Sequence, residues 1–155
     1  MSSEARNAAL ALLSRRNHSR FEIKQKLRRK GFAGEEIEAA LQDLAGRGYL
    51  DDAKTASALV ASRSRSGKGR GRLAAELAAR GVSRADSEAA LAGIDPADEE
   101  ARLLAALEKR RRVLAPGLTP AARSKKLFDH LVRRGFQPGA VLQALRKKGE
   151  PSDDD

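Results

Sequence analysis

Residues 20–41 read RFEIKQKLRRKGFAGEEIEAAL, and this stretch decides the fold because it occurs three times. It aligns without a gap with residues 70–91, RGRLAAELAARGVSRADSEAAL, and with residues 124–145, SKKLFDHLVRRGFQPGAVLQAL. The central glycines, Gly31, Gly81 and Gly135, are 50 and 54 residues apart. Self-similarity at such a period is typical of tandem repeats of one small structural unit.

The first half of the aligned stretch predicts a helix that ends at the glycine. One column holds Ile23, Leu73 and Leu127, and a second column four residues later holds Leu27, Leu77 and Leu131, which places each pair on one helical face. A basic residue precedes each glycine, where it complements the negative end of the helix dipole. Each of the three glycines is therefore expected to end its helix in the left-handed conformation.

A second helix follows each glycine, and an amphipathic segment precedes each pair of helices, at residues 5–16, 53–65 and 99–113. The sequence predicts an all-α fold of three tandem three-helix repeats that resemble helix-turn-helix units, with essentially no strand. Such small repeats should stack into an elongated molecule that can curve. We expect repeats at residues 1–50, 51–95 and 96–149, followed by a disordered acidic tail at residues 150–155.

Charge is the most informative part of the composition. The chain of 155 residues has 31 Lys and Arg against 21 Asp and Glu, a formal net charge of +10 and a pI near 10.5. This balance favours nucleic acid, an acidic protein surface or an anionic membrane as partner. No apolar run is long enough for a membrane span, and there is no cysteine. We expect a cytoplasmic monomer that does not engage a membrane.

Catalytic and cofactor motifs are not found in the sequence. The two histidines, His18 and His130, lie in different repeats and belong to no metal-binding or triad spacing. Gly67-Lys-Gly-Arg-Gly71 follows a predicted helix rather than a strand, and it fits neither of the two common nucleotide-binding patterns. We expect a protein that is not an enzyme and that has no metal and no cofactor.

The candidate binding residues are basic. Residues 63–72 carry five positive and no negative side chains, and small residues between them predict a flexible connection that presents the charge to a polyanion or an acidic groove. A solvated linker is the plainer interpretation of the same residues. The full set of candidates for partner binding is Arg63, Arg65, Lys68, Arg70, Arg72, Lys24, Arg28, Arg29, Arg133 and Arg134.

Reading of DNA bases by a helix-turn-helix unit is a further possibility, because three such units occur in a basic chain. However, the third helix of the first repeat, which would enter the groove, carries Glu35, Glu36 and Glu38. The positive charge lies instead on second helices and connections, which suits contact with a nucleic-acid backbone or a protein groove better than base readout.

Three separate motifs, in order, resemble those of the RecX family. The central one is Gly48-Tyr-Leu-Asp-Asp52, then Ser62-Arg63, Gly67-x-Gly69, Leu73-x-x-Glu76-Leu77 and Gly81-Val82. The opening motif is Leu12-Leu-Ser-Arg-Arg-x-His-Ser-Arg20 with Leu27-x-x-Lys30-Gly-Phe32, and the closing one is Leu131-x-Arg133-Arg-Gly-Phe136. The resemblance spans residues 5–148. It implies three three-helix repeats and a regulator of the bacterial recombinase RecA, in homologous recombination, DNA repair and the SOS response.

The same resemblance implies a partner and a mode of action. The partner would be the RecA nucleoprotein filament, whose groove the protein would occupy, inhibiting ATP hydrolysis and strand exchange and favouring disassembly. Direct DNA binding through the basic surface is the alternative, with DNA otherwise contacted weakly or within the filament. The chain departs from the family pattern at Thr55, Leu59 and Lys68, where aromatic residues are frequent, and at Arg70, where proline is frequent.

A second group of motif residues is expected to act structurally. Tyr49 is expected to contact the core, Asp51 and Asp52 to cap helices, and Gly67 and Gly69 to shape the basic connection. The complete structural set is Gly31, Tyr49, Asp51, Asp52, Gly67, Gly69, Gly81 and Gly135.

Overall fold

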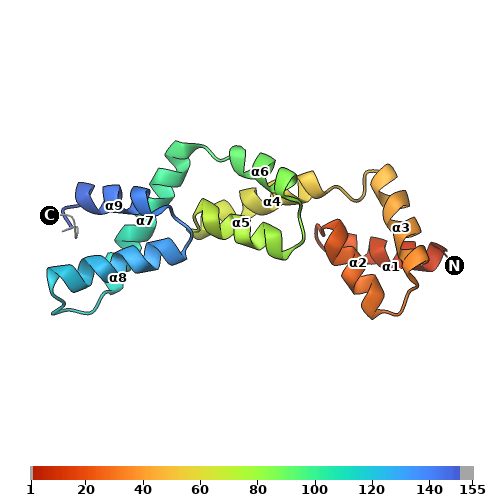
Figure 1. Cartoon of the computed structure of the whole chain (residues 1–155), viewed down its shortest axis with the longest axis horizontal. Coiled ribbons are helices and arrows are strands. Elements are labelled where there is room, and N and C mark those ends of the chain that lie inside the picture. The colour runs from red at the N-terminus through yellow and green to blue at the C-terminus, as the bar shows by residue number, and fades with distance from the viewer. Residues whose placement is uncertain (1, 151–155) are drawn as a thin grey trace. The chain divides into compact units, whose positions relative to one another are not determined.

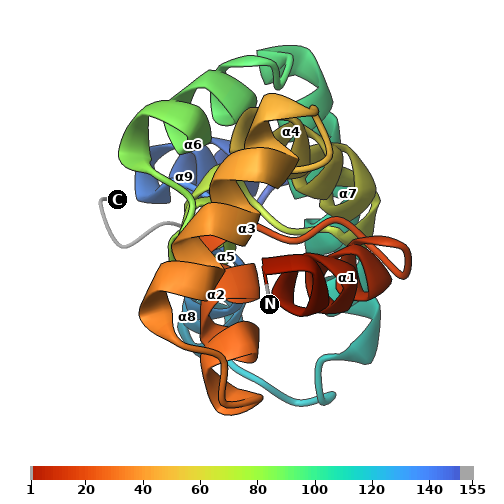
Figure 2. The same cartoon turned by 90° about the vertical axis from the view of Figure 1, so that its right-hand side faces the viewer.

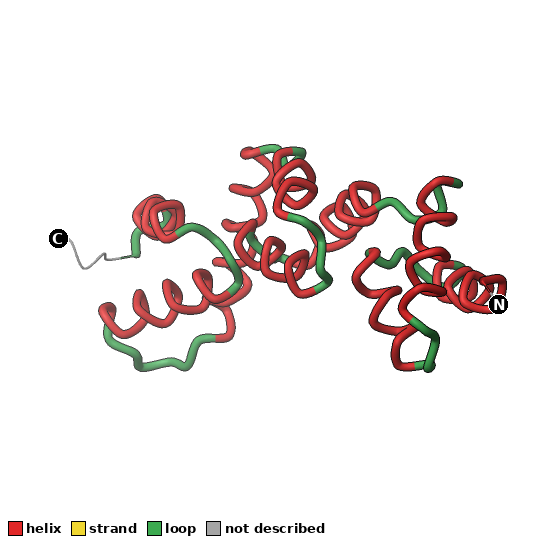
Figure 3. The backbone as a smooth tube through the Cα atoms, turned by 45° about the vertical axis from the view of Figure 1, so that its right-hand side comes forward, coloured by secondary structure: helices red, strands yellow, loops and turns green. Residues whose placement is uncertain are grey.

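The computed structural model describes residues 2–150 of the chain, and every regular segment in that range is helical (Figure 3). The all-α fold of three-helix repeats is therefore confirmed. The helices are α1 (Ser2–Leu13), α2 (Arg20–Arg29), α3 (Gly34–Gly46), α4 (Asp52–Arg63), α5 (Arg70–Ala79), α6 (Arg84–Ala92), α7 (Pro96–Val113), α8 (Pro120–Arg133) and α9 (Pro138–Lys147), with one 3₁₀ turn, η1 (Ser64–Ser66), after α4 (Figure 1).

The described chain divides into two compact units that cut across the middle repeat. Unit 1 comprises the residues up to Leu59 together with Glu76–Ala90, and unit 2 comprises Val60–Ala75 together with the residues from Leu91 onward. Helices α4 and α5 thus contribute to both units. Each unit contains one complete terminal repeat and part of the middle one.

The aligned apolar columns form the cores. All six of their side chains, those of Ile23, Leu73, Leu127, Leu27, Leu77 and Leu131, have an exposed fraction of 0%. In unit 1, α1, α2 and α3 pack against one another around this face (Figure 2). In unit 2, α7, α8 and α9 do the same, and Phe136 joins their core. Burial of leucine and isoleucine, at roughly 1.5–3 kcal/mol for each side chain, replaces the aromatic anchors that the chain lacks.

The three central glycines adopt the left-handed conformation predicted for them. Their φ angles are 91°, 74° and 96° at Gly31, Gly81 and Gly135. After each glycine, the next N–H bonds back to the preceding helix, as from Phe136 to the carbonyl of Leu131 at 3.2 Å. The side chains of Val82 and Phe136 are buried, and Phe32 packs against the core of unit 1. This geometry ends each second helix and satisfies its last carbonyls.

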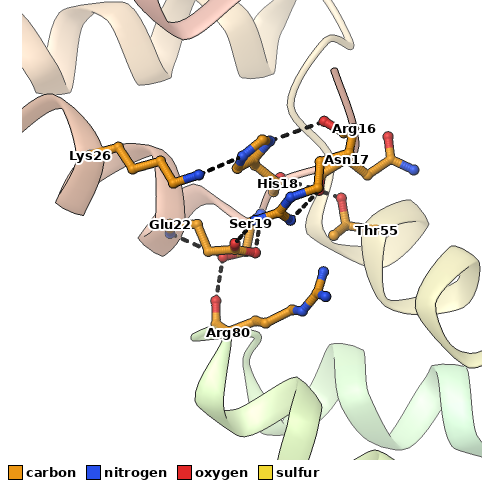
Figure 4. A network of polar contacts seen from close by, with 8 residues as sticks. All are labelled: Arg16, Asn17, His18, Ser19, Glu22, Lys26, Thr55 and Arg80. Atoms are coloured by element: carbon orange, nitrogen blue, oxygen red, sulfur yellow. Dashed lines mark hydrogen bonds and ion pairs between the residues drawn. The ribbon is translucent and has the colours of Figure 1, made fainter. Parts of the chain in front are cut away.

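One type of contact, which we call the joint, links the second helix of the first and of the middle repeat to the repeat that follows. In unit 1, the Ser19 hydroxyl at the start of α2 donates to the carbonyl of Arg80 at the end of α5 (Figure 4). In unit 2, the N–H of Gly69 donates to the carbonyl of Arg134 at 2.8 Å. The alignment pairs Ser19 with Gly69, and Arg80 with Arg134. The two joints are therefore structural equivalents.

Each joint also contains a carboxylate from the first helix of the following repeat. The N–H of Arg20 donates to Asp52 at 2.8 Å, and the equivalent N–H of Arg70 donates to Glu99 at 3.0 Å. The first N–H groups of a helix have no partner within it, and a carboxylate at that position also complements the helix dipole. A repeat therefore caps the second helix of the repeat before it.

The second joint requires close backbone approach. A Cβ atom added at Gly69 would lie 2.5 Å from the backbone carbon of Gly135 and from the nitrogen of Phe136. The N–H of Gly71 donates to the carbonyl of Gly135 at 3.0 Å. Side chains at these positions would push the two segments apart. Gly69 thus lies at a packed joint that leaves no room for a side chain.

Glu150 differs from the expectation of a disordered tail that begins there. Its side chain is buried, with one carboxylate oxygen 2.7 Å from Nη2 of Arg111 and 3.3 Å from Nε of Arg123. Its N–H donates to the carbonyl of Leu145. Two ion pairs from partly exposed arginines to this buried carboxylate hold the residue in unit 2, a contact that the acidic run after it obscured in the sequence. The remaining predicted tail, residues 151–155, lies outside the described residues.

We expect Gly69→Ala to lower the free energy of unfolding by about 1–3 kcal/mol, because the methyl group overpacks the joint. Gly139→Ala is the matched control, since a Cβ atom there meets nothing within 4 Å. Urea denaturation followed by circular dichroism measures both. Equal stability of the two variants would show that the joint tolerates a side chain.

Glu150→Gln should lower the free energy of unfolding by about 1–2 kcal/mol, because Arg111 and Arg123 lose their shared carboxylate. Glu100→Gln, which removes an exposed ion pair with Lys147, should change it little. The same denaturation measurement compares them, and an unchanged Glu150→Gln variant would contradict the assignment of Glu150 to the folded unit.

Candidate anion-binding surface

The predicted basic residues fall into both units. Lys24, Arg28 and Arg29 lie on α2 in unit 1, where Lys24 pairs with Glu38 at 2.9 Å and the two arginines are exposed. Unit 2 holds the others, which are Arg63, Arg65, Lys68, Arg70, Arg72, Arg133 and Arg134. Most of the predicted set is therefore brought together in one compact unit.

The basic connection between α4 and α5 is packed rather than free. Gly67 turns the chain with a φ of 70°, and the Arg134 guanidinium donates to the carbonyls of Gly67 at 2.9 Å and Ser66 at 2.7 Å. The expectation of a flexible connection is therefore wrong. Two hydrogen bonds from another repeat fix its path, and the sequence around residue 67 carries no sign of that distant partner.

Two adjoining hollows in unit 2 share His130 and Arg134 and together form what we call the basic cleft. The larger has a volume of about 500 Å³. Its lining residues are Arg65, Ser66, Gly67, Arg102, Ala105, Ala106, Lys109, Arg110, Val113, His130 and Arg134. The smaller has a volume of about 270 Å³ and is lined by Lys68, Arg72, His130, Arg133 and Arg134. Neither lining set includes a carboxylate, so the cleft concentrates positive charge.

Five predicted residues line the cleft, namely Arg65, Lys68, Arg72, Arg133 and Arg134. Arg63 and Arg70 do not line it, and the Arg70 guanidinium instead lies 3.5 Å from Glu99 at the joint. Sequence reasoning missed Arg102, Lys109, Arg110 and His130. Lys109 and Arg110 stood in a visible run of basic residues, but only the packing of α7 against α8 reveals which of that run faces the cleft.

The positive charge of the cleft affects the pKa of His130. Burial lowers the pKa of His130 below its usual value, and the positive charges of Arg110, Arg134 and Arg133 lower it further. The imidazole therefore stays neutral at neutral pH. In addition, Arg110 Nε is buried and has no hydrogen-bond partner among the described residues. These features mark the cleft as a place where positive charges lie close together and a buried donor has no acceptor.

The other histidine belongs to a structural network in unit 1 (Figure 4). His18 is buried, its Nδ1 lies 3.0 Å from the carbonyl of Arg16, and its Nε2 lies 3.1 Å from Nζ of Lys26. Because a carbonyl accepts and an ammonium donates, Nδ1 carries the proton and the ring is neutral. Burial lowers its pKa, in keeping with that state.

The motif around Asp52 differs in part from its expected role. Asp51 accepts from the N–H of Lys54 at 3.2 Å and caps α4, as expected. Asp52 caps α2 in the preceding repeat instead of its own helix. Tyr49 is 60% exposed, so its expected core contact is wrong. The left-handed Gly48 ends α3, and buried Leu50 supplies the core contact in place of Tyr49.

The comparison with family models decides the family. A model of the first three-helix domain of RecX matches residues 5–44, that of the second matches residues 51–91, and that of the third matches residues 98–145. The matches follow the order of the repeats and cover most of the chain. This chain belongs to the RecX family.

Curated relatives agree with this assignment. Regulatory protein RecX of Xanthomonas campestris pv. campestris (strain B100) is 36% identical over 138 residues, which is 89% of this chain and 83% of the relative. Regulatory protein RecX of Pelodictyon phaeoclathratiforme is 36% identical over 148 residues, 95% and 90% of the two chains. This RecX chain thus matches nearly the full length of both.

Solved RecX structures share the fold. One crystal structure of regulatory protein RecX superposes with a TM-score of 0.86 at 22% identity, covering 92% of this chain and 72% of that one. RecX from Lactobacillus salivarius superposes with a TM-score of 0.82 at 21% identity, covering 94% and 95%. Within residues 2–150 of this RecX, no helix is long and apolar enough to cross a membrane.

Stability should fall as the pH drops from about 6.5 toward 5, because His130 accepts a proton more readily in the unfolded chain than beside its arginines. His18, whose pKa is also lowered, contributes in the same direction. His130→Gln should therefore make the decline shallower, while at pH 8 its stability should match that of the unmodified protein. Urea midpoints across this pH range provide the measurement, and an identical pH profile would contradict the placement of His130 among positive charges.

Proposed function

We propose that this RecX protein is a non-enzymatic modulator of RecA that binds in the groove of the RecA–DNA filament, suppresses ATP hydrolysis and strand exchange, and favours disassembly. The membership of the RecX family supports RecA as the partner. The main support for contact with the filament is the basic cleft, which has no carboxylate in its lining. A filament of protein and DNA offers the anionic surface that such a cleft attracts.

Direct DNA binding through the basic cleft is the second candidate, because the same charges attract free phosphodiester chains. The two candidates differ in salt dependence. Direct binding predicts an affinity for bare DNA that falls with a log–log slope of roughly 0.7–0.9 for each phosphate neutralised. A shallow slope on bare DNA, combined with tight binding to filaments, would favour the filament as the target.

The deciding experiment is DNA-dependent ATP hydrolysis by RecA, titrated with this protein and repeated with a large excess of single-stranded DNA. We expect inhibition near or below one protein for each RecA, and we expect it to survive the added DNA. Inhibition that the excess DNA abolishes would mean that the protein sequesters the strand, and the direct-binding candidate would then replace the proposal.

The double variant Arg65→Glu/Arg72→Glu should weaken inhibition at least about tenfold, because four units of charge change at the basic cleft. Lys125→Glu/Lys126→Glu on the exposed part of α8 changes the net charge equally but lies outside the cleft lining. The ATPase titration compares the two. Equal loss in both variants would show that overall charge, rather than the cleft, carries the effect.

A further inference from the structure

We infer that the larger hollow of the basic cleft is a binding site for one nucleotide unit, with its phosphate held by the cations and its base and sugar against the apolar wall. This deepens the proposed function by naming the ligand of the cleft, and it rests on that function only for its biological setting. A bare strand would bind more weakly than the filament, because inhibition of RecA is expected to survive excess single-stranded DNA. The chemistry is that of an unpaired nucleotide, either within a single strand or free in solution.

The size and the lining of the larger hollow fit a nucleotide. The hollow of about 500 Å³ lies within the range of pockets that hold small ligands. Its lining combines cationic side chains, such as those of Arg65 and Lys109, with the apolar side chains of Ala105, Ala106 and Val113. A lining that is partly apolar and partly cationic suits a ligand with an uncharged body and a compact anionic group. A nucleotide has both, whereas an acidic side chain has no such body.

The arginines that line the larger hollow suit both a phosphate and an unpaired base. Four of the lining residues are arginines, a residue type whose planar guanidinium group binds phosphate with two hydrogen bonds and stacks on unpaired bases. One of them, Arg134, already donates to the carbonyls of Gly67 and Ser66. Arg110 Nε is buried without a hydrogen-bond partner among the described residues, so the free protein leaves a buried donor unsatisfied. A phosphate oxygen in the hollow would supply an acceptor for a donor of this kind.

The shape of the site excludes paired DNA. A base reaches a hollow only when it is unpaired and unstacked, which costs a few kcal/mol in a duplex and little in a single strand. The site should therefore prefer single strands. It should also be tolerant of sequence, because the lining offers charge and apolar surface rather than a pattern of groups that reads base edges.

The test measures binding of labelled dT12 and of a 12-base-pair duplex to the full chain by fluorescence anisotropy. We expect the single strand to bind about tenfold more tightly or better, in line with the energy of one stacked base. Equal affinity for the two would overturn the inference, because charge attraction alone would then account for binding.

Ala105→Trp would place a bulky side chain in the hollow without changing any charge, and Ala101→Trp, one turn earlier on α7 and outside the lining, is its matched control. Ala105→Trp should weaken dT12 binding about tenfold and Ala101→Trp less than about twofold. A second pair changes charge: Lys109→Glu should weaken binding more than Arg112→Glu, because Arg112 does not line the hollow. Tryptophan variants that bind alike would overturn the inference.

Competition identifies the source of the nucleotide. Competition by dTMP or ATP that exceeds that of inorganic phosphate, and that Ala105→Trp removes, would support the site with free nucleotides as ligands. Failure of free nucleotides to compete, with dT12 binding still lost in Ala105→Trp, would support it with the single strand as ligand. Hexaglutamate that competes as well as dT12 would overturn the inference in favour of an acidic peptide.

The RecA ATPase assay separates this inference from the proposed function. Loss of dT12 binding in Ala105→Trp, in a protein that never inhibits RecA, would leave the nucleotide site standing while the proposed function fails. Full inhibition of RecA by the unmodified protein, with equal affinity for the single strand and the duplex, would support the proposed function and overturn the nucleotide site.

Discussion

The capping of a second helix by the next repeat is the contact on which the remaining structure depends. A helix begins with N–H groups that it cannot satisfy itself. In α2 and α5, the first N–H goes to Asp52 or Glu99, and the residue before it bonds to the carbonyl of the following repeat. A repeat is thus incomplete without its successor. This explains why the compact units cut across the middle repeat. Its helix α4 caps α2 of the first repeat, and its helix α5 is capped by the third repeat.

The third repeat lacks this contact, because its second helix begins earlier. In the third repeat, α8 begins at Pro120, one turn before the aligned starts of α2 and α5. The N–H of Arg123, at the position of Ser19 and Gly69, therefore bonds within its own helix to Thr119 at 2.9 Å. The extra turn of α8 supplies this acceptor within the helix, whereas α2 and α5 are capped by the next repeat. At the other end, a Cβ atom on Gly31 would meet nothing within 4 Å, whereas one on Gly81 or Gly135 would meet the preceding repeat.

Local signals in the sequence predicted the fold. They did not predict the contacts between repeats. The apolar columns and the three glycines are periodic, so helices, turns and core positions followed from spacing alone. Asp52 reads as a cap of its own helix, because nothing near it reveals the N–H of Arg20 that it accepts. Tyr49 reads as a core residue because aromatic side chains usually are buried, yet Leu50 takes that place. The sequence identifies the basic residues of the chain. It does not show which of them line the cleft, because that depends on how the helices pack.

One aligned position explains why the second joint forms a basic cleft and the first does not. Where the first repeat has Glu22, the second has Arg72. At the first joint, the Arg16 guanidinium donates to the Glu22 carboxylate at 2.8 Å. Burial opposes the ionised form of Glu22, but the hydrogen bonds from Arg16 and Ser19, together with the charges of Arg16 and Arg80, lower its pKa, so cations there are neutralised locally. At the second joint, Arg72 adds to Arg133 and Arg134, and the lining contains no acid to balance them. The same backbone contact therefore yields a self-compensated structural link in unit 1 and an anion-attracting site in unit 2.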